Sequence, residues 1–323
     1  MIHSCAPLRV LTYHRIDSYY GDPLRDRPEL TVTPDQFQFQ MRTLVKSFQV
    51  VSLDQVLETA SGGSPLPARA VLITFDDAYS NVGTLAWPIM RELGLPATIF
   101  VPTGFPSLSK RYFWWDRLRA AFSETSETVL EDPELGKFNL VDRHSRLTAY
   151  KILVNVIKNS APEKAATIVE NTCQQLGEPV MANEAMDWDE IKKLASEGVQ
   201  FAPHSRNHPI LTQLDQAELE AELSEPLNDL KFHLGSAPPV LAYPSGYYNQ
   251  KVLDVARSLG YKLGFTTEMR NDRLCTRDNL AVGRISLSVK YSDPLFRITL
   301  MPGGLHLVKG YKFFNALRKK ILN

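Results

Sequence analysis

Two adjacent carboxylates and two closely spaced histidines are the residues of this sequence best suited to chemistry. Asp76 and Asp77 follow an apolar, β-branched run at residues 70–75, and His204 and His208 follow another such run. Neutral imidazoles at short spacing bind zinc and similar ions, and a carboxylate from elsewhere completes a three-ligand site with an open position. Asp77, His204 and His208 are therefore candidate metal ligands.

Each motif also has a plainer interpretation, because an aspartate after a strand can simply cap the next helix and paired histidines can lie on a loop without metal. The two motifs gain weight together, since strand ends of a β/α barrel converge on one face. A metal ion held by Asp77, His204 and His208 would polarise an amide carbonyl and activate a bound water as the nucleophile. The adjacent Asp76 would then accept the proton of that water.

The elements that must position these residues form an alternating pattern. Short β-rich runs are separated by helical patterns, including one at residues 34–48 and one after Ser52. Thr33 and Asp187 are typical helix N-caps. About seven parallel strands with helical crossovers predict an α/β fold, a distorted (β/α) barrel, although a doubly wound open sheet would give a similar pattern. The expected strands are residues 8–13, 70–75, 96–101, 198–203, 239–244, 262–267 and 280–287.

The chain divides into a barrel domain at residues 1–290 and a C-terminal helical extension at 291–323. Residues at about 105–185 break the strand rhythm, and we interpret them as a mostly helical insertion. In the extension, one helical stripe is apolar and the opposite side carries lysines. Such a helix docks on its own domain or makes a weak contact with a membrane surface. The apolar stripe consists of Phe313, Phe314, Leu317 and Ile321.

Composition excludes several classes of function. Of the 323 residues, 44% are hydrophobic, and Lys plus Arg and Asp plus Glu both total 36, so no basic field favours nucleic acid. Cys5, Cys173 and Cys275 form neither a disulfide framework nor a zinc-ribbon spacing, which favours a reducing compartment. We see no signal peptide and no transmembrane run, so the expected location is cytoplasmic.

The two motifs resemble those of the polysaccharide deacetylases of carbohydrate esterase family 4, whose shared region is the NodB-homology domain. The resemblance extends from about Leu8 to Ser288, with TFDDAYSN similar to the first motif and HSRNHP to the second. It implies that Asp76 is the catalytic base and that Asp77, His204 and His208 bind a divalent metal, Zn²⁺ or another first-row transition metal. It also implies a glycan substrate, an N-acetylhexosamine polysaccharide or glycolipid precursor, from which N-acetyl groups are removed.

The segment LAYPSGYYN resembles the family's third motif, which lines the groove and supplies a backbone NH to the oxyanion. The corresponding residues are Tyr243, Pro244, Ser245 and Gly246. This chain has Ala242 where many members have an arginine beside the catalytic aspartate, and Ser245 where they have tyrosine. The alternative is a plain turn.

The family's last motif, Leu-x-x-His, provides a general acid, but the matching VGRISLS has Arg284 and no histidine. His14 in LTYHRI, at the end of the first expected strand, is the replacement candidate, and an exopolysaccharide-deacetylase-like subgroup has a similar opening motif. A structural role is the alternative for this histidine. Trp114 and Trp115 are candidates for stacking on sugar rings, whereas Trp188 fits packing better.

Two other functions stay open. The same metal site would suit an amidohydrolase acting on a small amide or cyclic ureide, which would need a closed pocket rather than an open groove. A catalytically silent glycan-binding protein is suggested by the missing histidine and arginine, but the four residues needed for metal and base are all present. The sequence does not indicate an oligomeric state.

Overall fold

A sheet of parallel strands forms the centre of the protein. The computed structural model describes residues 7–274 and 279–310. In the sheet, the strand order is β12-β1-β5-β6-β9, and β4 pairs with the first half of β5. The strands are β1 (Arg9–Tyr13), β4 (Gln49–Val51), β5 (Ala70–Phe75), β6 (Thr98–Val101), β9 (Gln200–Pro203) and β12 (Ile285–Ser286).

Two further strands close the sheet into a distorted barrel. β10 (Val240–Ala242) pairs in parallel with β11 (Leu263–Phe265). Val282, just before β12, forms backbone hydrogen bonds with Gly264 and Thr266 and so joins β11 to the segment that leads into β12. No strand pairing joins β9 to β10 among the described residues, and there the ring is interrupted. All seven strands expected from the sequence are present, which confirms the predicted (β/α) barrel.

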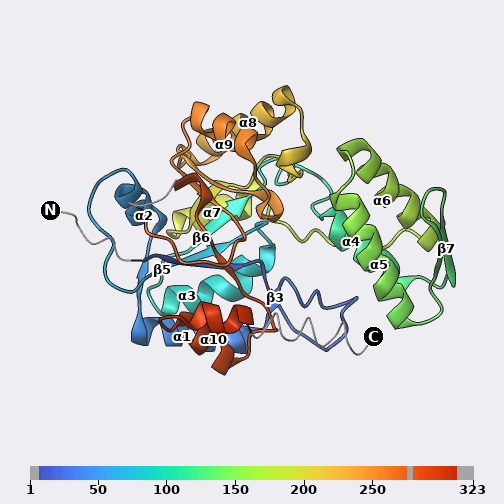
Figure 1. Ribbon diagram of the computed structural model, residues 1–323, viewed down its shortest axis with the longest axis horizontal. Helices are drawn as coiled ribbons and strands as arrows, with labels where there is room; N and C mark the ends of the chain where they lie inside the picture. Colours follow the sequence, from blue (N-terminus) through green and yellow to red (C-terminus); the bar gives the residue numbers. More distant parts are fainter. Residues whose placement is uncertain (1–6, 275–278, 311–323) are drawn as a thin grey trace.

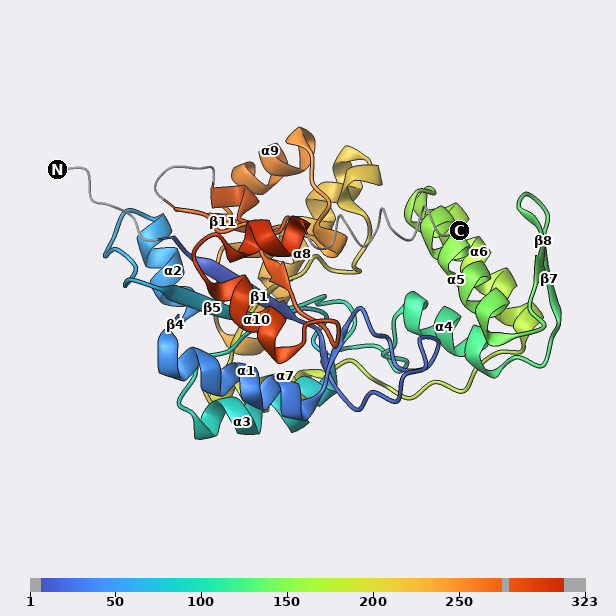
Figure 2. The same cartoon turned by 60° about the horizontal axis from the view of Figure 1, so that its bottom comes forward.

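Helices cover the outside of the barrel (Figures 1 and 2). Capping boxes begin α1, α2, α7 and α8 at Thr33, Ser52, Asp187 and Asp215, so local signals fix where these helices start. The covering helices are α1 (Pro34–Ser47), α2 (Leu53–Ala60), α3 (Trp87–Glu92), α7 (Trp188–Ser196), α8 (Gln216–Leu234), α9 (Gln250–Ser258) and α10 (Asp293–Leu300). Shorter elements are β2 (Arg15–Ile16), β3 (Thr31–Val32), the π-helical turn η1 (Val82–Ala86) and the 3₁₀ turns η2 (Leu211–Gln213), η3 (Pro244–Gly246) and η4 (Asn279–Ala281).

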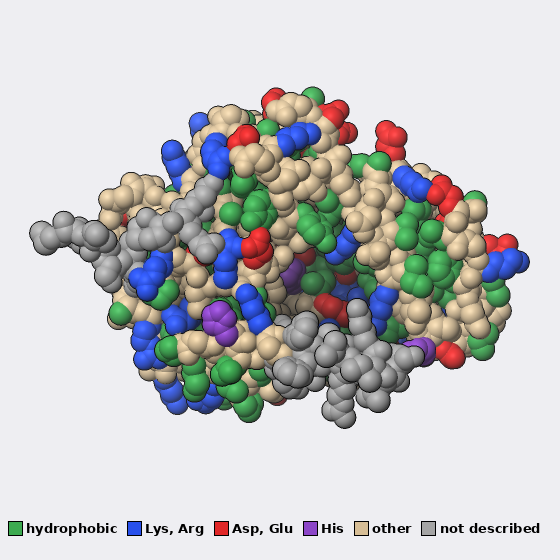
Figure 3. Space-filling view, in the orientation of Figure 1, with side chains coloured by type: hydrophobic (Ala, Val, Ile, Leu, Met, Phe, Trp, Pro, Cys, Tyr) green, Lys and Arg blue, Asp and Glu red, His purple; other side chains and the backbone are tan. Residues whose placement is uncertain are grey.

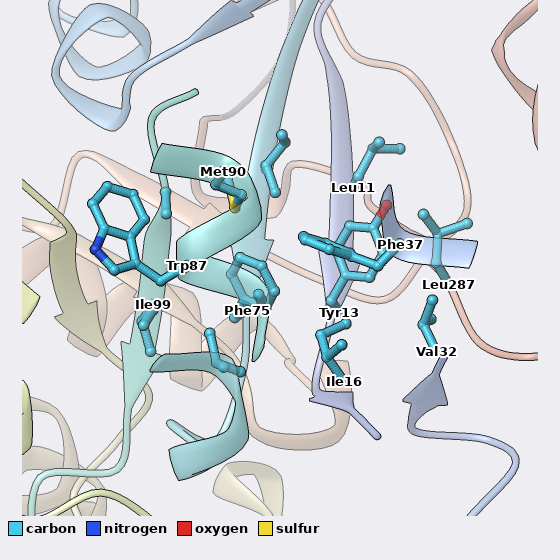
Figure 4. Close-up of a cluster of buried hydrophobic side chains, with 14 of the residues drawn as sticks. Leu11, Tyr13, Ile16, Val32, Phe37, Phe75, Trp87, Met90, Ile99 and Leu287 are labelled. Carbon is cyan, nitrogen blue, oxygen red and sulfur yellow. The ribbon is translucent and has the colours of Figure 1, made fainter. Parts of the chain in front are cut away.

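The strands are buried on both faces, as parallel strands covered by helices must be. Alternate residues of β1 and β5 belong to different cores, with Leu11 and Phe75 facing the helices and Val10 and Leu72 facing the barrel interior. Figure 4 shows the outer core, where the strand residues pack against side chains of α1 and α3. This double burial holds the strand ends rigidly in place.

The expected insertion forms a separate lobe beside the barrel (Figure 1). It contains α4 (Trp114–Glu124), α5 (Arg143–Lys158) and α6 (Pro162–Leu176), with its own apolar core. The hairpin of β7 (Val129–Asp132) and β8 (Gly136–Asn139), which the sequence did not indicate, joins α4 to α5.

At the other end of the chain, α10 packs on α1 (Figure 2). Phe296 of α10 is part of the outer core. The predicted apolar stripe at Phe313, Phe314, Leu317 and Ile321 lies outside the described residues, as do Cys5 and Cys275. Cys173 is buried with a free thiol in the core of the insertion. None of the described helices has the length and hydropathy that a membrane span requires.

Candidate active site

The predicted metal ligands meet at the carboxyl ends of the barrel strands. Asp77 follows β5, and His204 follows β9 directly. Asp77 Oδ1 lies 3.4 Å from His204 Nε2 and 3.3 Å from His208 Nε2. Candidate ligand atoms of the three residues lie within 4.8 Å of one another. Residues more than 120 positions apart in sequence are thus brought together by the barrel alone.

Backbone strain is concentrated at this cluster. Asp77, Ala78, Ser205, His208 and Ser245 all have φ between 50° and 70°, a left-handed conformation that is costly for residues with a Cβ atom. The turn between the two histidines is held by a hydrogen bond from the His208 amide to Ser205 Oγ, at 3.0 Å. The fold therefore supports sharp turns that aim side chains at one point.

The donor set of the cluster fits a metal ion. His204 Nδ1 donates a 2.7 Å hydrogen bond to the Ala242 carbonyl, so the lone pair of Nε2 points toward Asp77. Asp77 Oδ1 is buried and receives no hydrogen bond from the described residues. Burial raises the pKa of Asp77, but the imidazoles of His204 and His208 lower it to well below its usual range. A buried carboxylate and two ring nitrogens facing one another make a natural site for a cation.

Asp76 is held by an arginine that the sequence motifs did not assign. Arg284 donates from both terminal nitrogens to the two carboxylate oxygens of Asp76, each at 2.7 Å, and its Nε donates to the Thr266 carbonyl at 3.0 Å. The Arg284 side chain is fully buried. Burial raises the pKa of Asp76, and Arg284 together with His204 lowers it below its ordinary value. Asp76 is therefore ionised at neutral pH.

His14 lies at the end of β1 and lines the same cavity as the metal cluster. Its Nδ1 atom is buried without a hydrogen-bond partner among the described residues. Burial lowers the pKa of His14, while Asp77 and Asp76 act in the opposite direction. The Nδ1 atom of His14 can therefore exchange a proton with a bound ligand without breaking a hydrogen bond to the described residues.

The turn at residues 243–246 borders the cluster. Tyr243 is buried, and its hydroxyl donates to the Leu280 carbonyl at 2.7 Å. The amides of Tyr243 and Gly246 donate to the carbonyls of Phe265 and Tyr243. Ser245 lines the cavity at a φ of 55°. Gly246 is required sterically, because a Cβ there would lie 2.1 Å from Thr267 Oγ1.

Trp115 and Trp114 line the cavity at the base of the insertion. The Trp115 ring stacks on Phe113, with centroids 4.5 Å apart, and lies 4.8 Å from the ring of His208. Trp188 is buried and stacks on His233, with centroids 3.8 Å apart, which agrees with a packing role.

A single cavity of about 700 Å³ contains His14, Asp76, Asp77, His204 and His208 and continues to the helices of the insertion. Figure 3 shows the molecular face on which the surface is hollowed between the barrel and the insertion. The chemistry-bearing residues therefore lie within a recess with room for a ligand much larger than acetate.

Comparison with known proteins shows which proteins this chain resembles. The sequence profile of the family described as polysaccharide deacetylase matches residues 147–264. Over that stretch the chain resembles the polysaccharide deacetylase family. YxkH of Bacillus subtilis is 21% identical over 266 residues, which are 81% of this chain and 65% of that protein. The poly-β-1,6-N-acetyl-D-glucosamine N-deacetylase of Escherichia coli K12 is 24% identical over 265 residues, 80% of this chain but only 33% of that protein.

Solved structures of deacetylases share the fold. The Streptococcus pyogenes deacetylase PplD superposes with a TM-score of 0.64 at 20% identity, covering 93% of this chain and 100% of that one. IcaB of Ammonifex degensii gives a TM-score of 0.59 at 17% identity, covering 92% and 98%. These likenesses establish the NodB-type barrel.

The chain departs from the motif pattern of the family that it resembles in one place that the structure explains. Ala242 stands where many members have an arginine beside the aspartate, and here Arg284 supplies the guanidinium to Asp76 from the approach to β12. The signal was present in the sequence, because Arg284 is a charged residue within the apolar run LAVGRISL. A buried charge in a strand needs a partner.

Proposed function

We propose that this protein hydrolyses the N-acetyl groups of an N-acetylhexosamine in a polysaccharide or a glycolipid precursor, releasing acetate and a free amine. The observation that carries the proposal is the Asp77–His204–His208 cluster beside an ionised Asp76 in one cavity. The match of residues 147–264 to the polysaccharide deacetylase family supports it.

The ligand set of one carboxylate and two imidazoles suits Zn²⁺ or another first-row transition metal. A divalent ion held by Asp77, His204 and His208 would polarise the acetamide carbonyl and lower the pKa of a water molecule. Asp76 accepts a proton from the attacking water as general base. Arg284 keeps the carboxylate of Asp76 ionised. Its two parallel hydrogen bonds also fix the plane of that carboxylate.

The remaining steps need an oxyanion donor and a proton for the leaving nitrogen. Within the turn at residues 243–246, the Tyr243 and Gly246 amides are already engaged and Pro244 has none, so we assign the oxyanion contact to the Ser245 amide. His14 in its protonated form donates a proton to the departing nitrogen as the C–N bond breaks, and the proton that Asp76 took from water restores it for the next turnover. The products are acetate and an amine.

The size of the cavity favours this reaction over hydrolysis of a small amide or cyclic ureide. A cavity of about 700 Å³ that extends to a separate lobe is larger than such substrates need. A catalytically silent binding protein would not need a strained cluster with Asp76 and Arg284 paired beneath it.

The test combines metal content with acetate release. The E. coli relative is named for poly-β-1,6-N-acetyl-D-glucosamine, so oligomers of this polymer are the first substrates to assay, followed by N-acetylglucosaminyl phosphates. We expect about one divalent ion per chain and acetate release that Asp76→Asn abolishes without loss of metal. Metal binding without acetate release from any N-acetylated sugar would favour the binding protein, and absence of metal after reconstitution would contradict both.

A further inference from the structure

Beyond the metal cluster, the cavity is walled by one face of α5. The residues of α5 that line it recur at helical spacing, so a continuous stripe of this helix faces the recess. Most of the stripe is apolar, and lysines lie at its exposed edge and at its end. The stripe consists of Leu147, Tyr150, Lys151, Val154, Ile157 and Lys158.

A face of α6 forms the second part of this wall. Ala165, Ala166 and Val169 line the cavity from α6, and their small side chains leave space above the helix. Pro209 and Ile210, directly after His208, line the cavity from the barrel. The recess is therefore an aliphatic groove that begins at a predicted metal ligand.

The chemistry of this groove suits a hydrocarbon chain better than a chain of sugars. Sugar hydroxyls need hydrogen-bond partners when they leave water, but Val154, Ile157, Ala165, Ala166 and Val169 offer no polar side-chain group. Sugars also stack on aromatic rings, which in this cavity are confined to Trp114, Trp115 and Tyr150. We therefore expect the sugar at the barrel end and an apolar chain along α5 and α6.

A lysine lies between these two regions. Lys158 ends α5, is half-buried and lines the cavity that also contains Asp77. Its ammonium group lies within ion-pair distance of no carboxylate among the described residues. The two arginines that line the cavity are already in ion pairs, Arg117 with Glu170 and Glu178, and Arg119 with Glu29. Of the two lysines that line the cavity, Lys151 is exposed, so Lys158 is the half-buried cavity cation left to meet an anionic group of a ligand.

We infer that the substrate is an anionic glycolipid, with its N-acetylated sugar at Asp77, His204 and His208, its phosphate or other anionic link at Lys158, and its hydrocarbon chain between α5, α6 and Ile210. This inference rests on the proposed deacetylase function and narrows its substrate to the amphipathic class.

The first experiment varies the apolar chain. N-acetylglucosaminyl phosphates esterified with methyl, butyl or octyl groups are compared by KM for acetate release and by calorimetric Kd on the Asp76→Asn variant. Each methylene that the groove buries should lower both constants by about fourfold. Ala166→Trp, which fills the groove from an exposed α6 position, should erase this dependence, whereas Thr167→Trp, the exposed neighbour outside the cavity, should preserve it.

The second experiment removes the cation. Lys158→Gln should raise Kd for the alkyl phosphates by about tenfold and leave Kd for neutral octyl N-acetylglucosaminide unchanged, because only the phosphate ester carries charge for the ammonium group to meet. Lys164→Gln, on α6 and outside the cavity lining, is the matched control and should change neither.

The outcomes distinguish a failure of the glycolipid inference from a failure of the proposed deacetylase function. Acetate release with KM and Kd independent of chain length, and insensitive to Ala166→Trp, would overturn the glycolipid inference and leave the deacetylase intact. Chain-dependent Kd without acetate release would support the groove and contradict the deacetylase. Chain dependence that emerges only after Phe313→Asp and Phe314→Asp would assign the groove to the protein's own C-terminal segment and overturn the inference.

Discussion

The rim of the barrel and the face of the insertion meet in one cavity but are built in opposite ways. At the rim, buried charges lie on strained turns, with Asp77, His208 and Ser245 at positive φ. Across residues 105–185, positive φ occurs at Gly136 and Gly177 among the described residues, and regular helices present aliphatic side chains. Strain and buried charge are tolerated where the double-sided core of the barrel fixes the backbone.

This contrast between the rim and the insertion suggests that the two regions have different roles. We propose that the rim supplies the groups that act on the reacting amide and that the insertion supplies the surface that selects the rest of the substrate. Changes at the rim should therefore alter kcat or stability for every substrate, whereas changes on the insertion should alter KM for some substrates.

Removal of a metal ligand should have the largest effect. Asp77→Ala and His208→Ala each leave two protein ligands, so we expect loss of bound divalent ion and a fall in kcat/KM of about 10³-fold or more on every substrate. Elemental analysis and acetate assays measure both. His306→Ala, an exposed histidine outside the site, should behave as wild type. Retained metal in both ligand variants would show that the cluster is not the metal site.

Loss of Arg284 should have the second largest effect, because it leaves the Asp76 carboxylate buried without its counter-ion. Arg284→Met should lower the free energy of unfolding by about 3–5 kcal/mol, as measured by urea denaturation. The double variant Asp76→Asn with Arg284→Met removes both charges and should recover a large part of that stability while staying inactive. Equal destabilisation of the single and double variants would mean that Arg284 acts through packing alone.

Arg284→Lys separates the charge of Arg284 from its two parallel hydrogen bonds to Asp76. A lysine keeps the charge but cannot donate in parallel to both oxygens of Asp76. We expect stability between that of wild type and Arg284→Met, with kcat still reduced. Full kcat in Arg284→Lys would show that the bidentate geometry is unnecessary.

The sequence was sufficient to predict those parts of the protein that local patterns control. Apolar runs followed by Asp76 and His204 located the strand ends, and parallel strands necessarily bring such ends to one side of a barrel. Capping boxes at Thr33 and Asp187 fixed helix starts to the residue. The strand ends and the helix starts together were enough to predict that Asp77, His204 and His208 meet.

The parts that escaped prediction depend on long-range packing. The pairing of Asp76 with Arg284 joins residues 208 positions apart, and no local signal reports which carboxylate a buried arginine meets. The same holds for the groove: Val154 and Ala166 are unremarkable helix residues until the insertion lies against the barrel. Motifs were enough to propose the residues of the site, whereas the groove beside it requires the folded arrangement.

His14 tests whether the rim includes the general acid. His14→Ala should lower kcat by about 10²-fold while metal content stays unchanged, since the ring supplies a proton rather than a ligand. The loss should be smaller for an acetamide with a leaving amine of low pKa, which needs less protonation. An equal loss for all leaving groups would remove His14 from proton transfer.

The smallest effect concerns Asp116, which lies where the insertion joins the barrel. Arg27 Nε contacts its carboxylate at 2.9 Å and Tyr79 donates to it at 2.8 Å. Burial raises the pKa of Asp116 to about 6, against the lowering influence of Arg27. The folded protein thus holds a proton that the unfolded chain releases near pH 4, so stability falls as pH rises from about 4 to 6.

Asp116→Asn removes that titration. Relative to the variant, wild type should lose on the order of 2–3 kcal/mol of unfolding free energy between pH 4 and pH 6, measured by urea denaturation across this range. Asp189→Asn, whose side chain is 96% exposed, should follow the wild-type pH dependence. A loss in wild type that Asp116→Asn reproduces would show that Asp116 stays ionised beside Arg27, and the junction would then be an ion pair at every pH tested.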